Sequence, residues 1–111
     1  MPLLKNGASQ QNPSRVINIG SIDGLRVSTM DNFAYGASKA AVHFLTKNLA
    51  LRLGPKGVTV NAIAPGAFQS NMMNATLEKF QDKIESENPL GRIGAPEDMA
   101  GLALYLASNA S

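Results

Sequence analysis

The chain has no cysteine and no tryptophan, and its net charge is only +2. The missing thiols exclude disulfides and thiolate metal sites. The few basic residues are dispersed, which argues against a nucleic-acid partner. No apolar run approaches the roughly 18 residues of a membrane span, and the N-terminus lacks the apolar core of a signal peptide. We therefore expect a cytoplasmic protein with no membrane or nucleic-acid partner.

What remains is a composition suited to burial. Of the 111 residues, 44% are hydrophobic and 16% are charged, as in a globular domain. No internal repeat, linker or low-complexity segment divides the sequence. We therefore treat residues 1–111 as a single domain.

Two β-branched runs predict buried strands, at Val16–Ile19 and at Val58–Ile63. Between them, Asp31 or Asn32 can cap a helix that ends at Gly54. Its expected apolar face recurs at steps of three and four residues and comprises Ala34, Ala37, Ala41, Phe44, Leu45 and Leu49. A strand, a helix of about 20 residues and a second strand make a βαβ unit, so the strands should be parallel with a right-handed crossover.

The flanking segments predict further helices. Residues 2–14 read as the end of a preceding helix followed by a polar loop. Asn74–Glu87 carries Leu77, Phe80 and Ile84 at helical spacing and predicts a short amphipathic helix. Pro96 begins another helix with acidic residues in its first turn. Its body, M-A-G-L-A-L-Y-L-A, is apolar nearly all round, so we expect it to be buried.

Tyr35 and Lys39 stand four residues apart at the head of the long helix. This spacing puts both side chains on one face, with roughly 6 Å of rise between them. A free phenol has a pKa of about 10, but a neighbouring ammonium favours the phenolate. Such a pair can act as a general acid–base at a carbonyl or alcohol oxygen. A boundary tyrosine beside a solvated lysine is the alternative, and for an isolated Y-x-x-x-K it is the commoner case.

The surroundings of the pair favour the catalytic interpretation. Ser21 follows a predicted strand directly, and the second strand delivers Pro65 and Gly66 to the same edge of the sheet. The carboxyl ends of parallel strands are where ligands bind in open α/β sheets. The serine, the start of the helix and the Pro65 segment should therefore converge.

Four stretches together resemble the short-chain dehydrogenase/reductase family. They are I-N-I-G-S, Y-G-A-S-K-A-A, N-A-I-A-P-G-A-F-Q-S-N-M and G-R-I-G-A-P-E-D-M-A, in the family's order and spacing. The resemblance extends from about Leu3 to Ser111. It implies the C-terminal half of an α/β fold, a partial Rossmann-type, doubly wound parallel sheet. The sequences of these motifs are similar to those of 3-oxoacyl reductase-like members.

The resemblance also implies roles for individual residues. Tyr35 would donate a proton to the substrate carbonyl, and Ser21 would bond the same oxygen. Lys39 would stabilise the phenolate and hold the nicotinamide ribose, with Tyr35 beside it. The segment that begins at Pro65 and Gly66 would complete the cofactor contacts. In it, Phe68, through its backbone, and Ser70, through its hydroxyl, match positions that touch the nicotinamide carboxamide, although the family more often has threonine in place of Ser70.

The implied activity is NAD(P)-dependent interconversion of a ketone, with 3-oxoacyl groups among the candidates, and a secondary alcohol. NADP is slightly favoured over NAD, and the full-length parent is expected to be a homo-oligomer. The family's glycine-rich T-G-x-x-x-G-x-G turn, which binds the pyrophosphate, is not in this sequence. The chain could thus be part of a longer enzyme, a truncated product, a half that assembles with another chain, or a non-catalytic remnant that acts as an interaction partner or not at all.

The other polar residues receive structural interpretations. We expect His43 to lie on the helix surface or in packing, because no partner has metal-binding spacing, and we predict no metal site. Asn18 and Asn61 should form hydrogen bonds at strand edges. Asp23 should be a loop residue. The alanines of the long helix belong either to the core or, by the resemblance, to a subunit interface.

Overall fold

The computed structural model describes residues 2–9, 11–28, 32–67 and 74–111, with only the backbone described at 74–79. Its elements follow one another as α1 (Pro2–Asn6), β1 (Ser14–Ile19), η1 (Ile22–Gly24), α2 (Phe33–Leu53), η2 (Gly54–Lys56), β2 (Val58–Ile63), α3 (Asn74–Glu87) and α4 (Pro96–Ala107). The prefix η marks a single 3-10 turn. Among the described residues, no helix is both long enough and apolar enough to cross a membrane.

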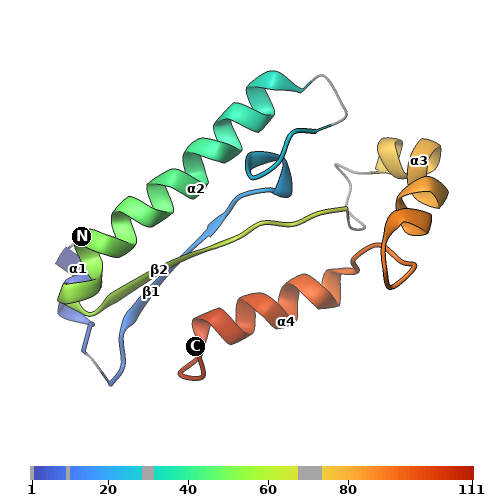
Figure 1. Ribbon diagram of the computed structural model, residues 1–111. Helices are drawn as coiled ribbons and strands as arrows, with labels where there is room; N and C mark the ends of the chain where they lie inside the picture. The colour runs from blue at the N-terminus through green and yellow to red at the C-terminus, as the bar shows by residue number, and fades with distance from the viewer. Residues whose placement is uncertain (1, 10, 29–31, 68–73) are drawn as a thin grey trace.

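The two strands pair in parallel, as predicted. Their register runs without offset from Ser14 opposite Val58 to Ile19 opposite Ile63. β1 begins two residues before the predicted Val16, whereas β2 and α3 have the predicted bounds. Figure 1 shows α2 along one face of this sheet and α4 along the other. Helices on both faces of a parallel sheet are the α/β arrangement that the sequence predicts.

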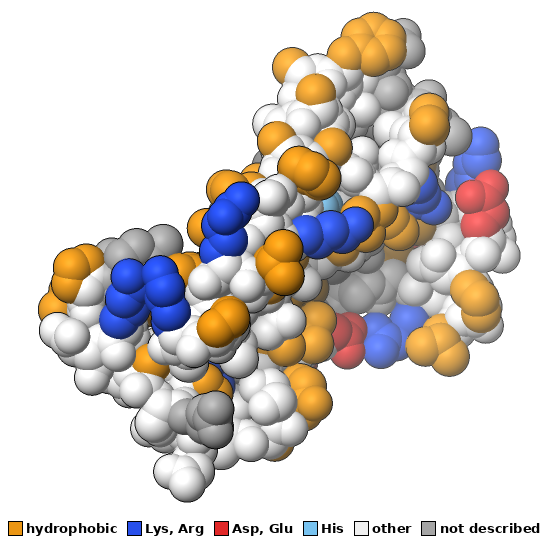
Figure 2. Space-filling model, turned by 60° about the vertical axis from the view of Figure 1, so that its left-hand side comes forward, with side chains coloured by type: hydrophobic (Ala, Val, Ile, Leu, Met, Phe, Trp, Pro, Cys, Tyr) orange, Lys and Arg blue, Asp and Glu red, His pale blue; other side chains and the backbone are white. Residues whose placement is uncertain are grey.

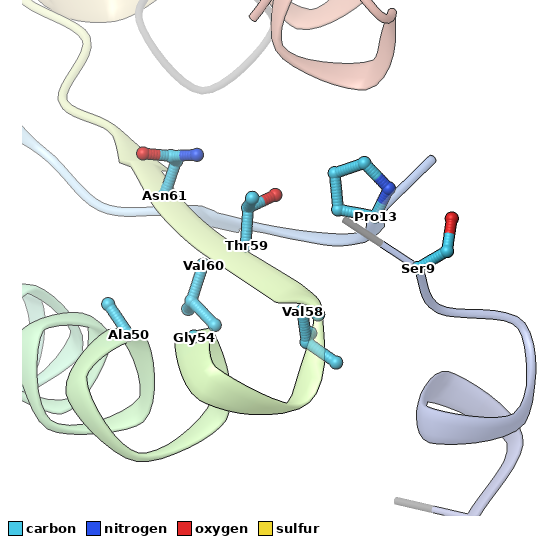
Figure 3. Close-up of a pocket in the computed structure, with 9 residues that line it drawn as sticks. Ser9, Pro13, Ala50, Gly54, Val58, Thr59, Val60 and Asn61 are labelled. Carbon is cyan, nitrogen blue, oxygen red and sulfur yellow. The ribbon is translucent and has the colours of Figure 1, made fainter. Parts of the chain in front are cut away.

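The core lies at the end of the sheet where β2 begins. Leu53, Val58 and Val60 are buried there, and the partly buried residues packed against them are Leu4, Ala8, Val16, Leu49 and Ala50. Figure 3 shows Val58 and Val60 on the α2 side of β2 and Thr59 and Asn61 on the other side. This is the two-residue alternation of a strand. It anchors the C-terminal half of α2 to the sheet.

The face of α2 that packs inward is only partly the predicted one, because Leu49 of the predicted set packs against the core. Phe44 and Leu45 are exposed, at 69% and 52%, and the three alanines of the predicted face are exposed as well. The helix instead turns Gly36, His43 and Thr46 toward β1 and η1. The physical reason is that close backbone approach and polar contacts at the end of β1 decide the orientation. Within this chain the alanines of the predicted face therefore do not form the core, whereas Ala50, nearer the end of the helix, packs against it.

The predicted burial of α4 is also wrong. None of its residues is buried, and Leu104 is 72% exposed. Within the described chain α4 packs on the sheet mainly against β1, and a helix that is apolar all round can bury only the side that faces its neighbour. Figure 2 shows that hydrophobic side chains, in orange, are scattered over the face of the molecule that is turned to the viewer.

Candidate active site

The carboxyl ends of the two strands continue side by side into their loops. Gly20 N–H donates to the Ile63 carbonyl at 2.8 Å, and Ile22 N–H donates to the Pro65 carbonyl at 3.0 Å. Ser21 lies between these two bonds, so the serine loop and the Pro65 segment are joined along their main chains. The predicted convergence of these two segments is present.

Ser21 caps the short η1 turn. Its Oγ accepts a hydrogen bond from Asp23 N–H at 3.1 Å, and its carbonyl accepts one from Gly24 N–H at 3.0 Å. The backbone at Ser21 is extended, as an N-cap requires, and the residue is only 6% exposed. These bonds leave the hydroxyl proton of Ser21 available for an acceptor, because both use serine oxygens as acceptors.

The start of α2 is tied to the same turn. Asn32 occupies the N-cap position, but its side chain makes no capping bond, contrary to the predicted role; Asp31 lies outside the described residues. The amide Nδ2 of Asn32 instead donates to Asp23 Oδ2 at 3.3 Å. Asp23 is thus the loop residue that the sequence predicts, and it links η1 to the helix that bears the tyrosine and the lysine.

Tyr35 and Lys39 lie together on the side of α2 that faces the strand ends. Lys39 Nζ is 5.7 Å from the centroid of the Tyr35 ring, within the range of a cation–π contact. The same Nζ donates to the carbonyl of Ile19 at 3.1 Å. Because Ile19 is two residues before Ser21, the lysine connects the tyrosine to the serine loop.

Gly24 permits this close arrangement. A Cβ atom placed on Gly24 would lie 2.6 Å from the carbonyl carbon of Lys39 and 2.7 Å from the nitrogen of Ala40. Both are backbone atoms of α2, and a rigid helix backbone cannot yield as a flexible side chain does. The η1 turn therefore lies directly against the helix because residue 24 has no side chain.

Two polar contacts of α2, one with the serine loop and one with β1, were not predicted. His43 Nε2 contacts the main chain of Ser21, and Asn18 Nδ2 donates to Thr46 Oγ1 at 3.0 Å across the layers rather than along a strand edge. Asn18 and Thr46 are 28 residues apart, so no local pattern connects them. The sequence feature that could have indicated the role of His43 is its position four residues after Lys39, which places both side chains on one side of the helix.

The remaining predicted cofactor residues are only partly described. Pro65 is joined to the serine loop, Gly66 is exposed, and Phe68 and Ser70 lie outside the described residues. Ala67 accepts a hydrogen bond at 2.9 Å from Gly94 N–H, which comes from the loop before α4. This bond brings the G-R-I-G-A-P-E-D-M-A stretch next to the Pro65 segment.

A pocket of about 440 Å³ lies elsewhere, against the first half of β2 and the end of α2. Figure 3 shows several of its lining residues, among them Ser9, Pro13 and Thr59. None of the predicted site residues lines it. We therefore place the candidate site at the opposite, carboxyl end of the strands. In the described part of the chain, no group of three potential ligands could hold a metal ion.

Known proteins resemble this chain over most of its length. A protein-family profile described as Enoyl-(Acyl carrier protein) reductase matches residues 2–111. The rhamnolipids biosynthesis 3-oxoacyl-(acyl-carrier-protein) reductase of Pseudomonas aeruginosa is 45% identical over 113 residues, which cover 99% of this chain and 44% of that protein. The cyclohexanol dehydrogenase of Rhodococcus sp. is 40% identical over 104 residues, which cover 92% of this chain and 38% of that protein.

Solved structures resemble this chain over a similar extent. The Pseudomonas aeruginosa RhlG/NADP active-site complex superposes with a TM-score of 0.87 at 44% sequence identity, covering 99% of this chain and 45% of that one. The chain therefore spans less than half the length of both curated relatives and of the chain in the solved structure.

Proposed function

Because the chain belongs to the short-chain dehydrogenase/reductase family, we propose that Ser21, Tyr35 and Lys39 are the catalytic residues of a nicotinamide-dependent oxidoreductase. The reaction is the interconversion of a ketone and a secondary alcohol. One observation carries the proposal: Lys39 Nζ lies near the Tyr35 ring and bonds Ile19, two residues before the serine. A proton donor, a cation and a hydroxyl thus occupy one edge of the sheet.

Each residue has a separate chemical task. In the reduction direction, Tyr35 gives its phenolic proton to the carbonyl oxygen of the substrate. The Lys39 ammonium stabilises the phenolate that remains. Ser21 donates its hydroxyl proton to the same substrate oxygen, since its Oγ already accepts from Asp23 N–H. In the oxidation direction the proton moves from the alcohol to the Tyr35 phenolate.

The donors of this site suit the nicotinamide end of a dinucleotide. A lysine ammonium has three N–H donors, and the bond to Ile19 uses one of them, so Lys39 can also bond ribose hydroxyls. The segment from Pro65 and Gly66 to Phe68 and Ser70 would contact the carboxamide. The bound nicotinamide supplies the hydride. NADP is favoured over NAD because a solved relative is described as an NADP complex.

The favoured substrate is a 3-oxoacyl thioester. This choice is supported by the relative described as a 3-oxoacyl-(acyl-carrier-protein) reductase, at 45% identity. The relative described as a cyclohexanol dehydrogenase supports the wider class of ketones and secondary alcohols. One name denotes reduction of a ketone and the other oxidation of a secondary alcohol. A tyrosine can donate or accept the proton that either reaction requires.

The test measures oxidation of reduced nicotinamide cofactor by the full gene product. NADPH and NADH are each mixed with acetoacetyl-CoA or cyclohexanone, and loss of reduced nicotinamide is followed by absorbance. We expect oxidation of NADPH that depends on acetoacetyl-CoA, with slower turnover of NADH. Turnover of cyclohexanone alone would move the assignment to an alcohol dehydrogenase. Absence of turnover with every pair would overturn the enzymatic proposal in favour of a non-catalytic family member.

A further inference from the structure

The imidazole of His43 contacts the main chain of Ser21 from α2. Its Nε2 lies 3.1 Å from the Ser21 nitrogen and 3.0 Å from the Ser21 oxygen. His43 follows Lys39 by one helical turn and Tyr35 by about two, so all three side chains leave one broad side of the helix. The helix that bears the proposed proton donor therefore also contacts the proposed serine.

The two short distances cannot both be hydrogen bonds of a neutral ring. In one tautomer Nε2 accepts from the Ser21 N–H, and in the other it donates to the Ser21 carbonyl. That carbonyl already accepts from Gly24 N–H at 3.0 Å. In the described part of the chain, the Ser21 N–H has the imidazole as its acceptor. Because a buried N–H without an acceptor is destabilising, the geometry favours an unprotonated Nε2, with the ring proton on Nδ1.

The place of the ring is set by a second feature, the absence of a side chain at Gly20. A Cβ atom added to Gly20 would lie 2.2 Å from His43 Nε2 and 2.4 Å from its Cε1. The imidazole thus fits against the end of β1 because residue 20 is glycine. Gly20 and His43 form a matched pair directly before the serine.

Ser21 is consequently held through three of its own groups. Its N–H is bonded by His43, its carbonyl by Gly24 N–H and its Oγ by Asp23 N–H. The last two bonds lie within the η1 turn, and the first one alone ties the residue to α2. We propose that His43 is a positioning residue: by accepting the Ser21 N–H, it holds the serine hydroxyl in place relative to Tyr35 and Lys39. This inference rests on the proposed function for its catalytic consequence.

The first experiment reads the tautomer directly and needs no activity. Nitrogen-15 spectra of the imidazole are recorded with the ring neutral, on the protein in the form that its gene encodes. The signal lost in His43→Gln identifies the residue. We expect an Nε2 shift of the unprotonated, pyridine type and a protonated Nδ1. A proton on Nε2 would overturn the proposal, because Nε2 would then donate to the carbonyl and leave the Ser21 N–H without its acceptor.

The second experiment separates hydrogen bonding from packing. In His43→Gln the side-chain amide oxygen can still accept from the Ser21 N–H, whereas His43→Leu fills the space without an acceptor. We expect His43→Leu to lower kcat by about 10- to 100-fold, as for a misplaced catalytic group, and to leave the KM for NADPH unchanged. We expect His43→Gln to recover most of the lost rate. Lys47→Gln, at an exposed position one turn further along α2, is the matched control and should match the unaltered protein.

Amide hydrogen exchange at Ser21 distinguishes the failure of this inference from that of the proposed function. Faster exchange at Ser21 in His43→Leu than in His43→Gln supports the bond even if no carbonyl substrate is turned over. Equal exchange in the two variants, or equal kcat, would overturn the positioning role even in an active reductase. If the leucine variant fails to fold, the tautomer of the unaltered protein still decides.

Discussion

Lys39 Nζ donates a 3.1 Å hydrogen bond to the carbonyl of Ile19, the last residue of β1. A side chain of α2 thus bonds the main chain of the strand that leads into Ser21. This bond holds the ammonium near the strand end. The lysine therefore adds a polar link between the helix and the strand that leads to the serine loop.

Replacing Tyr35 by phenylalanine should lower kcat by two or more orders of magnitude, about the contribution of a positioned general acid, because the transferable proton is removed. Steady-state kinetics of the gene-encoded form with NADPH and acetoacetyl-CoA measure the effect. Tyr105→Phe removes the other tyrosine hydroxyl of the sequence, on the half-exposed surface of α4, and should leave kcat unchanged. Near-normal turnover of Tyr35→Phe would refute the assignment of the proton donor.

Lys39→Met should weaken NADPH binding and lower kcat together. The substitution keeps the apolar stem but removes both the donor to Ile19 and the cation near the Tyr35 ring. Calorimetry gives the Kd of NADPH, and the same preparation gives kcat. Lys47→Met, two turns further along α2, is the control for loss of one positive charge. If both variants bound NADPH alike, Lys39 would be no more than a surface cation.

Gly24→Ala should destabilise the protein by about 1 to 3 kcal/mol, the usual cost of overpacking. The added methyl group would meet the backbone of α2 at Lys39 and Ala40, so η1 must move away from the helix. Urea unfolding measures the change. Gly101→Ala, in α4, adds a methyl group that meets no other element of the described chain within 4 Å, and it should instead be neutral or stabilising. Equal stability of the two variants would contradict the close approach.

The start of α4 should weaken only in acid. Hydrogen bonds from the Arg92 guanidinium and from Ala95 N–H to the Asp98 carboxylate lower the pKa of Asp98 to about 2. Since an unfolded aspartate has a pKa of about 3.9, the stabilisation is complete above that value and is lost as the pH falls toward 2. Amide exchange in the first turn of α4 should therefore accelerate below about pH 4, relative to the rest of the helix. In Asp98→Asn this pH dependence should be missing.

Residues 1–111 expressed alone should aggregate and bind NADPH weakly or not at all. Many large apolar side chains are exposed in the described chain, among them Val27, Phe33, Leu51 and Leu104. Apolar surface of this extent needs cover by other protein. Light scattering and calorimetry with NADPH test the expectation. A monomer that unfolds cooperatively and binds NADPH with micromolar affinity would contradict it.

The sequence predicts the β-strands and the meeting of their ends well, because local signals mark them. Val58–Ile63 is bounded by Gly57 and Pro65, and parallel strands necessarily bring Ser21 and Pro65 to one edge. The inward face of α2 could not be predicted in this way. Its apolar period points to Phe44 and Leu45, but contacts with η1 and Asn18 turn other residues inward.

The unpredicted part of the site depends on pairs that are distant in sequence. His43 and Ser21 are 22 residues apart, and a lone histidine on a helix has no pattern that indicates its partner. Likewise, G-S-I-D-G shows that a turn is present, but only the folded chain shows that Gly20 and Gly24 lie against α2. For the same reason the exposure of α4 escapes prediction, since it depends on what lies beside the helix.

The parallel register of β1 and β2 has a consequence for insertions and deletions. The strands end level with each other, Ile19 opposite Ile63, so the two loops leave the sheet at the same height. A slip of β2 by one residue would displace Pro65 by about 3.3 Å and turn Val58 and Val60 away from α2. The burial of those two valines, at the other end of the sheet, therefore fixes the strand register and with it the position of Pro65 relative to Ser21. An insertion or deletion within Val58–Ile63 should therefore disrupt the candidate site as well as the core.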